Sequence, residues 1–389
     1  MNALEDKTRV ESSGGECVRS VGRNMGVELF RVVSMLLVVL LHIVGRGGVL
    51  SATEPLSAQY KIAVFVQVLT YCSVNCYALI SGFANVNAGF KFRRFVHLWL
   101  ETVFLITFLN IVTPLLSDGF TITREWWLNG FFPLAKRELW YLCAYFFMYP
   151  LMLLINHGLH ATRQWQHIVV IVLLQMPTLF RLIDGQDNYA LSGGYSAMWL
   201  ICLYVMGAYF RIYGAPRWAK WYVTLPVFFI SCGIAFLAKI VPEERLLAGQ
   251  MESVSAWYEN REMLISYLSP CMVVMSLMLL LFFMQLKING KAVRRILSEF
   301  GRATWGVFVI HVCSAVWYLD DFWDLFPAIA DKSPLWMSVS LVASALLWYF
   351  IFSLLSIGRA YLFKLCRADR AVECIADGVA ARLERGRRV

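Results

Sequence analysis

The sequence predicts an all-α integral membrane protein, a polytopic bundle of about ten transmembrane helices with both termini in the cytoplasm. Of its 389 residues, 59% are hydrophobic and only 16% are charged. Soluble domains are roughly 45–50% apolar and about 25% charged, so this composition suits a chain surrounded by lipid. The apolar residues also recur in long runs, and the basic residues gather on one side of these runs.

The length of each apolar run sets the number of spans. A helix needs about 20 apolar residues to cross the hydrocarbon core of a bilayer. The fourth, fifth and ninth runs are short, so we expect these segments to be tilted or partly re-entrant. The predicted spans are residues 25–45, 61–83, 95–116, 139–156, 167–183, 196–213, 221–240, 263–286, 303–319 and 335–358.

Basic residues near span ends set the orientation, because they accumulate on the cytoplasmic side. With the N-terminus inside, 24 Lys and Arg residues fall in cytoplasmic segments and ten fall outside. The chain therefore divides into a cytoplasmic tail (1–24), one membrane domain (25–358) and a basic cytoplasmic tail (359–389). The net charge of +9 follows from this topology, and we expect no nucleic-acid partner.

Cysteine and histidine placement predicts no metal site. Most of the ten cysteines lie inside apolar runs, where cysteine behaves as a small hydrophobic residue. No cysteine pair has a metal-site spacing with partner ligands, and no two histidines lie four residues apart in one span. The sequence also lacks a Gly-rich phosphate loop and a serine nucleophile elbow.

Ionisable residues in the first span are the strongest functional candidates, because charge inside a bilayer is costly. Glu28, Arg31 and His42 lie in the run VELFRVVSMLLVVLLHI. Arg31 and His42 are eleven residues apart, or three helical turns plus about 20°, so all three residues share one helix face. Arg31 lies toward the cytoplasm and His42 about 16 Å further along the axis. The alternative is an interfacial Glu28–Arg31 pair with His42 in a helix contact.

Two later spans carry weaker polar signals. Glu101 in the third span is expected to face the bundle interior, toward a basic partner. In the ninth span His311 follows Thr304 by seven residues, so the two side chains share a face.

Five segments, in this order, resemble the membrane acyltransferase-3 family, whose members O-acetylate cell-surface glycans and related acceptors. The resemblance covers most of the chain. Phe308 stands where the family often has Tyr, and His97 stands where it usually has Arg followed by Pro. The segments are ELFRVVSMLLVVLLH, with its acid, Arg and His; NCYALISGF (Asn75 to Phe83); FRRFVHLW; ELWYLCAYFFMYPLMLLIN (Glu138 to Asn156); and GRATWGVFVIH (Gly301 to His311).

The resemblance implies an enzyme that moves an acyl group, usually acetyl, from cytoplasmic acyl-CoA to a hydroxyl of a cell-surface or lipid-linked glycan, in a bacterial plasma membrane. His42 is then the candidate base or acyl carrier, because imidazole can exchange protons near neutral pH. Arg31, oriented by Glu28, is the candidate anchor for the donor's phosphates. The sequence shows no appended serine-esterase domain, which some relatives carry, and this favours relatives that act alone on a small or lipid-linked glycan.

Further residues receive expected roles from the same resemblance. A second candidate site for the phosphates of acetyl-CoA is the basic group Lys91, Arg93 and Arg94, which positive-inside topology also explains. Ser81, Tyr141 and Thr304 are alternative donors to a transition-state oxyanion. The expected substrate-binding residues are Ser81, Trp140, Tyr141, Thr304 and His311.

The rival interpretation is a transporter or flippase of a glycan or small molecule. Ten helices with buried charges suit substrate passage, but transporters often show matched, Gly- or Pro-broken helices in two halves. Prolines interrupt several spans here without a matching arrangement between halves.

Overall fold

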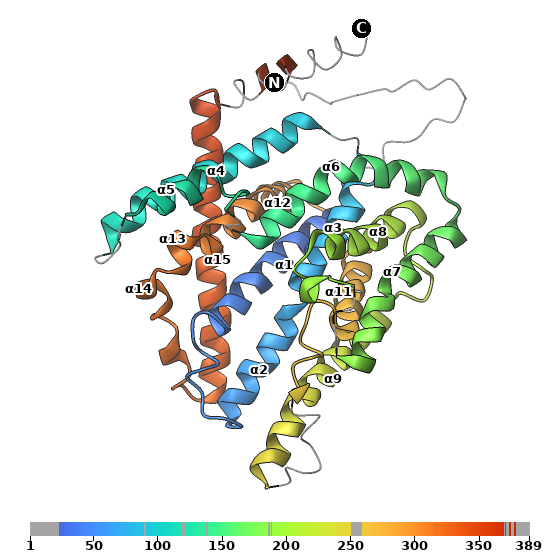
Figure 1. Cartoon of the computed structure of the whole chain (residues 1–389), viewed down its shortest axis with the longest axis vertical. Helices are drawn as coiled ribbons and strands as arrows, with labels where there is room; N and C mark the ends of the chain where they lie inside the picture. Colours follow the sequence, from blue (N-terminus) through green and yellow to red (C-terminus); the bar gives the residue numbers. More distant parts are fainter. Residues whose placement is uncertain are drawn as a thin grey trace.

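The computed structural model describes residues 23–88, 91–117, 122–136, 139–185, 187, 189–249, 259–368, 370, 373–374 and 377–378. The regular secondary structure of these residues consists of helices, with no strand. Figure 1 shows the arrangement. The helices are α1 (Met25–Val44), α2 (Ala58–Tyr71), α3 (Ser73–Asn85), α4 (Phe92–Leu116), α5 (Arg124–Phe131), α6 (Trp140–Ala161), α7 (Gln164–Asp184), η1 (Ser192–Gly194), α8 (Ala197–Tyr213), α9 (Trp221–Leu247), α11 (Pro270–Phe283), α12 (Lys291–Val312), α13 (Ser314–Trp317), α14 (Asp320–Trp323), η3 (Pro327–Ile329) and α15 (Pro334–Leu365).

The predicted helical membrane protein is confirmed. Within the described residues, seven helical stretches are long and apolar enough to cross a membrane: α1, α2 with α3, α4, α6, α7, α9 and α15. Only 11% of the apolar window of α7 is buried inside the molecule. Most apolar side chains of α7 therefore face outward. An apolar surface of this size is unsuited to water and is explained by contact with lipid.

Each predicted span contains helix, but several boundaries differ from those predicted. The apolar helices α8 and α11 have only 17 and 14 residues. The ninth predicted span, 303–319, covers the second half of α12, whose charged first half begins at Lys291. That helix ends because Cys313 adopts an extended backbone. The last helix continues to Leu365, seven residues past the predicted end of the tenth span.

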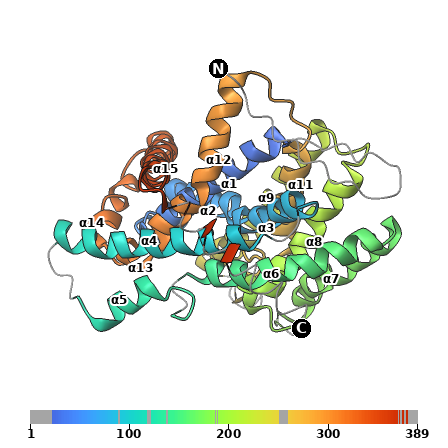
Figure 2. The same ribbon diagram turned by 90° about the horizontal axis from the view of Figure 1, so that it is seen from above.

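The helix α1 lies in the interior, where the other elements can contact it from several sides. Its N-terminus is capped by Asn24, whose side chain accepts a hydrogen bond from the Val27 amide and donates one to the Met284 carbonyl. Figure 2, seen from above, shows α1 and α3 in the middle, with α4 and α5 along one side and α15 nearly end-on. Because both termini are predicted to be cytoplasmic, the top of Figure 1 corresponds to the cytoplasmic side in that prediction.

The tightest helix contact is between α3 and α8. A Cβ atom on Gly82 would lie 1.9 Å from the Tyr204 carbonyl oxygen, and one on Gly207 would lie 2.0 Å from that of Leu79. Small residues allow such an approach, and close packing drives helix association in lipid. This contact holds α3, and with it Ser81, in a fixed position against the core.

Candidate active site

Glu28, Arg31 and His42 lie on one face of α1. Arg31 Nη1 is 3.3 Å from each carboxylate oxygen of Glu28, and Arg23 donates to the same carboxylate at 2.5 Å. The Glu28 side chain is 7% exposed and that of Arg31 is 20% exposed. A buried carboxylate needs compensation, and the two guanidinium groups supply it. Glu28 thereby orients Arg31, whose Nε and Nη2 have no hydrogen-bond partner in the part of the chain that the structure describes.

His42 forms a hydrogen-bonded pair with His311 from α12. His311 Nε2 lies 3.0 Å from His42 Nδ1, and His311 Nδ1 lies 2.6 Å from the Val307 carbonyl oxygen. A carbonyl only accepts hydrogen bonds, so His311 Nδ1 carries a proton. When both rings are neutral, His311 Nε2 is then an acceptor and His42 Nδ1–H donates to it. This leaves the lone pair of His42 on Nε2.

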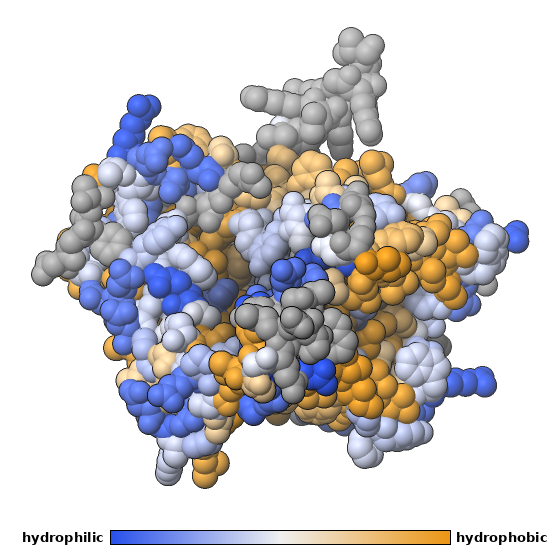
Figure 3. All heavy atoms as spheres, turned by 60° about the horizontal axis from the view of Figure 1, so that its bottom comes forward, coloured by the Kyte–Doolittle hydropathy of each residue, from blue (hydrophilic) through white to orange (hydrophobic). Residues whose placement is uncertain are grey.

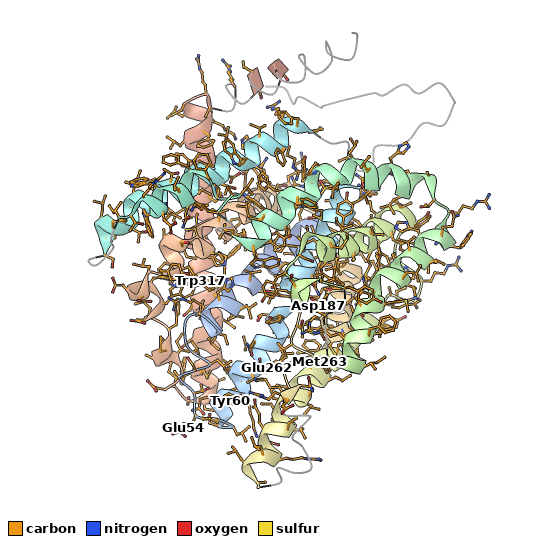
Figure 4. All side chains as sticks on the ribbon, viewed as in Figure 1. Glu54, Tyr60, Asp187, Glu262, Met263 and Trp317 are labelled. Carbon is orange, nitrogen blue, oxygen red and sulfur yellow. The ribbon has the colours of Figure 1, made fainter. Side chains whose placement is uncertain are left out.

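The two imidazoles differ in access. His311 is buried, at 1% exposure, whereas His42 is partly exposed and lines a cavity. Trp317 packs edge-on against the His42 ring, with 5.2 Å between ring centroids. Figure 4 labels Trp317 about halfway down the molecule. His42 is therefore the accessible member of the pair, and His311 lies behind it.

The late segment Gly301–His311 docks along the functional face of α1. A Cβ atom on Gly301 would lie 2.6 Å from the Glu28 carboxylate, so glycine makes room for the buried acid. One turn on, Thr304 lines the cavity and donates to the Gly301 carbonyl at 3.0 Å. The segment ends at His311 beside His42. Its polar residues thus follow α1 from Glu28 to His42.

A cavity of about 320 Å³ connects these groups. Its wall combines aromatic and apolar side chains with a few polar ones, as small-molecule sites do. Seven predicted site residues line it: Arg31 and His42 from α1, Ser81 from α3, Arg94 from α4, Trp140 and Tyr141 from α6, and Thr304 from α12.

The cavity contains residues that sequence reasoning missed. Tyr77 donates a hydrogen bond to the Arg31 carbonyl at 2.8 Å, and Asn85 and Tyr145 also line the wall. Tyr77, Ser81 and Asn85 lie four residues apart, so their polar side chains share one face of α3. That ladder is a signal from which Tyr77 and Asn85 could have been predicted. Nothing in the spacing indicates Tyr145.

A polar network holds Arg94 at the cavity. Arg94 Nη1 donates to Asn85 Oδ1 at 3.1 Å. Asn156, the last residue of the predicted Leu-Trp-Tyr segment, donates to the Asn85 carbonyl at 2.9 Å and accepts from the Tyr204 hydroxyl at 2.7 Å. Asn85 on α3 and Asn156 on α6 thus together orient the guanidinium group of Arg94.

A second cavity, of about 530 Å³, adjoins the first on the predicted cytoplasmic side. The two share four lining residues: Arg94, Leu98, Glu101 and Arg302. The predicted basic residues Lys91 and Arg93 line only the second cavity, together with Arg359 and Lys364. Six Lys and Arg residues against Glu101 and Glu299 make the lining of the second cavity cationic. The wall that it shares with the first cavity connects it to the cavity that His42 lines.

Glu101 faces the interior, as predicted, and its basic partner is Arg359. The two side chains form an ion pair and are only 7% and 8% exposed. Arg359, assigned by sequence to the C-terminal tail, lies within α15. The pair joins α4 to α15 at the wall shared by both cavities.

Comparison with known proteins identifies the family. A family model described as an acyltransferase domain, that of the acyltransferase-3 family, matches residues 24–357. No curated protein and no solved structure matches the chain. The match spans α1 through most of α15, and it includes every lining residue of the first cavity except Arg23 and most lining residues of the second. The chain therefore belongs to the acyltransferase-3 family of membrane proteins and is an acyltransferase.

Proposed function

We propose that this protein is a membrane O-acetyltransferase, which moves acetyl from cytoplasmic acetyl-CoA to a hydroxyl of a cell-surface or lipid-linked glycan. The observation that carries the proposal is the Nε2 lone pair of His42, in a cavity that adjoins a cationic one. A base in a cavity that adjoins an anion-binding one suits acyl transfer from a phosphate-bearing thioester.

The cationic cavity accounts for the donor's charge. Lys91, Arg93 and Arg94 supply ammonium and guanidinium donors for the phosphates of acetyl-CoA, with Arg31 further in. The thiol arm is long and uncharged. It would follow the aromatic wall of the first cavity from Arg31 to His42, which are about 16 Å apart along the helix axis. The thioester would then lie next to His42.

The chemical step then needs one proton to move twice. His42 Nε2 takes the proton from the acceptor hydroxyl, and the oxygen attacks the thioester carbonyl carbon. As the tetrahedral intermediate collapses, the C–S bond breaks and the thiolate takes the proton from His42. His311 holds the reactive tautomer by accepting from His42 Nδ1–H, a role seen wherever a base is oriented by a third group.

Tyr141 is the best placed of the three candidate oxyanion donors. Thr304 donates to the Gly301 carbonyl, and Ser81 lies against Tyr145. The Tyr141 hydroxyl has no hydrogen-bond partner among the residues that the structure describes, and its ring lines the cavity. A phenol with a free O–H can donate to an oxygen that becomes negative.

The proposal is tested with the purified protein in lipid nanodiscs, labelled acetyl-CoA and surface glycan that has been de-O-acylated with base. We expect the label to move to the glycan in a base-labile ester. Passage of glycan or acetyl-CoA through proteoliposomes without any acetyl ester would support the transporter instead. Loss of a base-labile acetyl mass from the surface glycans of a deletion strain would confirm the reaction in a bacterial plasma membrane.

Replacing His311 tests whether it acts through His42. His311→Leu removes the acceptor for His42 Nδ1–H, and we expect kcat to fall by about 10–100-fold, as for other residues that orient a functional imidazole. The KM for acetyl-CoA should stay unchanged. His311→Gln retains an oxygen that can accept the bond, so part of the activity should return. Equal loss in both variants would indicate a role in packing only.

A further inference from the structure

Four aromatic rings form a continuous cluster on the outer side of the catalytic cavity. Trp140 and Tyr267 line that cavity. Tyr195 packs against both, with ring centroids 4.7 Å from Trp140 and 4.8 Å from Tyr267. Tyr71 lies 4.8 Å from Tyr267, and its hydroxyl is 3.4 Å from that of Tyr195. Trp140 and Tyr267 therefore separate the cavity from Tyr195, which is 45% exposed.

The cluster lies where a ligand from the outer side can reach it. Tyr195 lies two residues before the start of α8, and Tyr267 lies three residues before the start of α11. These are the two short apolar helices. Because these helices are short, their outer ends stop well above the lower ends of α2 and α9 in Figure 1. Figure 4 shows Asp187, in the loop that carries Tyr195, about halfway up the molecule. Figure 3, with the bottom of Figure 1 turned forward, shows hydrophilic side chains beside hydrophobic ones near the middle of this face.

Polar groups hold the cluster rigid. Arg181 Nη1 donates to Ser266 Oγ at 2.6 Å, and Ser266 donates to the Gly193 carbonyl at 3.3 Å. The Asp187 carboxylate accepts from the Gly193 amide at 2.9 Å. The loops that carry Tyr195 and Tyr267 are therefore tied together. A site whose rings are already in place loses little conformational entropy when it binds a ligand.

The backbone of Tyr267 is fixed from the core as well. Asn75 donates to the Tyr267 carbonyl at 2.9 Å, and the Trp199 indole donates to Asn75 Oδ1 at 3.2 Å. Asn75 begins the segment NCYALISGF on α3. This segment therefore supplies Ser81 to the cavity at one end and supports the cluster at the other.

The chemistry of the cluster suits a sugar better than lipid. Aromatic residues of a membrane belt face outward, toward the lipid head groups. Here Tyr267 is 6% exposed and its ring is on the cavity wall. Next to the rings, Arg181 Nε has no hydrogen-bond partner among the described residues. Sugars combine apolar C–H faces, which pack on aromatic rings, with hydroxyls, which accept hydrogen bonds from guanidinium groups.

We propose that Tyr195, Tyr71, Trp140 and Tyr267, with Arg181 at their edge, form the saccharide subsite of the acceptor. It binds a sugar ring on the outer side of the cavity and directs a hydroxyl past Trp140 and Tyr267 toward His42. This inference rests on the proposed glycan O-acetyltransferase function and adds where its acceptor binds. The donor's phosphates are proposed to bind on the cationic side, and Tyr195 does not line either of the two described cavities.

The test measures glycan binding and transfer separately. The full-length protein in nanodiscs is titrated by calorimetry with de-O-acylated surface glycan from a deletion strain, without donor. Tyr195→Ala removes the most exposed ring, and we expect the Kd for this glycan to rise about tenfold, which corresponds to 1.4 kcal/mol. The KM for the glycan should rise equally and that for acetyl-CoA should stay unchanged. Tyr195→Phe should bind nearly as wild type.

Tyr189 offers a matched control in the same loop. It is 51% exposed and stacks on Phe180, away from the cluster. Tyr189→Ala should leave the glycan Kd unchanged. Equal glycan Kd values for Tyr195→Ala and Tyr189→Ala would overturn the subsite, as would a wild-type protein that does not bind the glycan. Glycan binding that depends on Tyr195, without any acetyl transfer by the wild type, would support the subsite and refute the proposed reaction.

Discussion

His42→Ala is expected to lower acetyl transfer by about 10²–10⁴-fold, the contribution of a positioned general base. The protein should still fold and insert, because His42 is partly exposed to a cavity and its loss leaves no buried charge. Binding of acetyl-CoA should change little, since its phosphates are proposed to bind at the other end of the cavity. Transfer is measured in nanodiscs and donor binding by calorimetry.

A second histidine variant separates catalysis from general disturbance. His157 is exposed near the end of α6, and His157→Ala should transfer acetyl at the wild-type rate. Because His42→Ala creates a space the size of an imidazole ring, added imidazole should restore part of its activity. Wild-type O-acetylation of the glycans in cells that carry only His42→Ala would refute the role of His42.

Arg31→Ala is expected to weaken acetyl-CoA binding by about 10–100-fold, because a hydrogen bond to a charged group contributes about 1.5–3 kcal/mol. Glu28 keeps Arg23 as a partner at 2.5 Å, so the carboxylate is not left uncompensated and the fold should persist. Arg31→Lys should recover only part of the affinity, since an ammonium lacks the planar donor fork of a guanidinium.

Calorimetry with acetyl-CoA and with coenzyme A lacking the acetyl group checks this result. Both ligands should lose affinity equally, because Arg31 is expected to contact phosphate and not the thioester. Arg217→Ala is the control, since Arg217 lies in a predicted cytoplasmic loop and lines neither of the two described cavities. An unchanged dissociation constant for Arg31→Ala would place the phosphate site in the second, cationic cavity alone.

Local periodicity explains why the first helix was predictable. Glu28, Arg31 and His42 belong to one continuous helix, and helix geometry alone puts them on one face. Tyr77, Ser81 and Asn85 follow the same rule on α3. Glu101 was predictable as an interior residue because charge avoids lipid, although its partner was not.

The partners across helices were not predictable in the same way. His311 and His42 are 269 residues apart, and Arg359 and Glu101 are 258 apart. Sequence placed His311 with Thr304 on one face and Arg359 in a tail. Only packing of α12 against α1 puts one imidazole behind the other, and only the extension of α15 brings Arg359 to the wall that joins the two cavities.

The sequence by itself determined that this is a helical membrane protein with a polar face on its first helix, because apolar length and helical period are properties of neighbouring residues. Family resemblance added acyl transfer. The tertiary structure decided which nitrogen of His42 contacts His311, which basic residues line the cavity beside it, and that aromatic rings from α2, α6 and two loops meet at the cavity wall. Those features depend on contacts between distant segments, which no local pattern encodes.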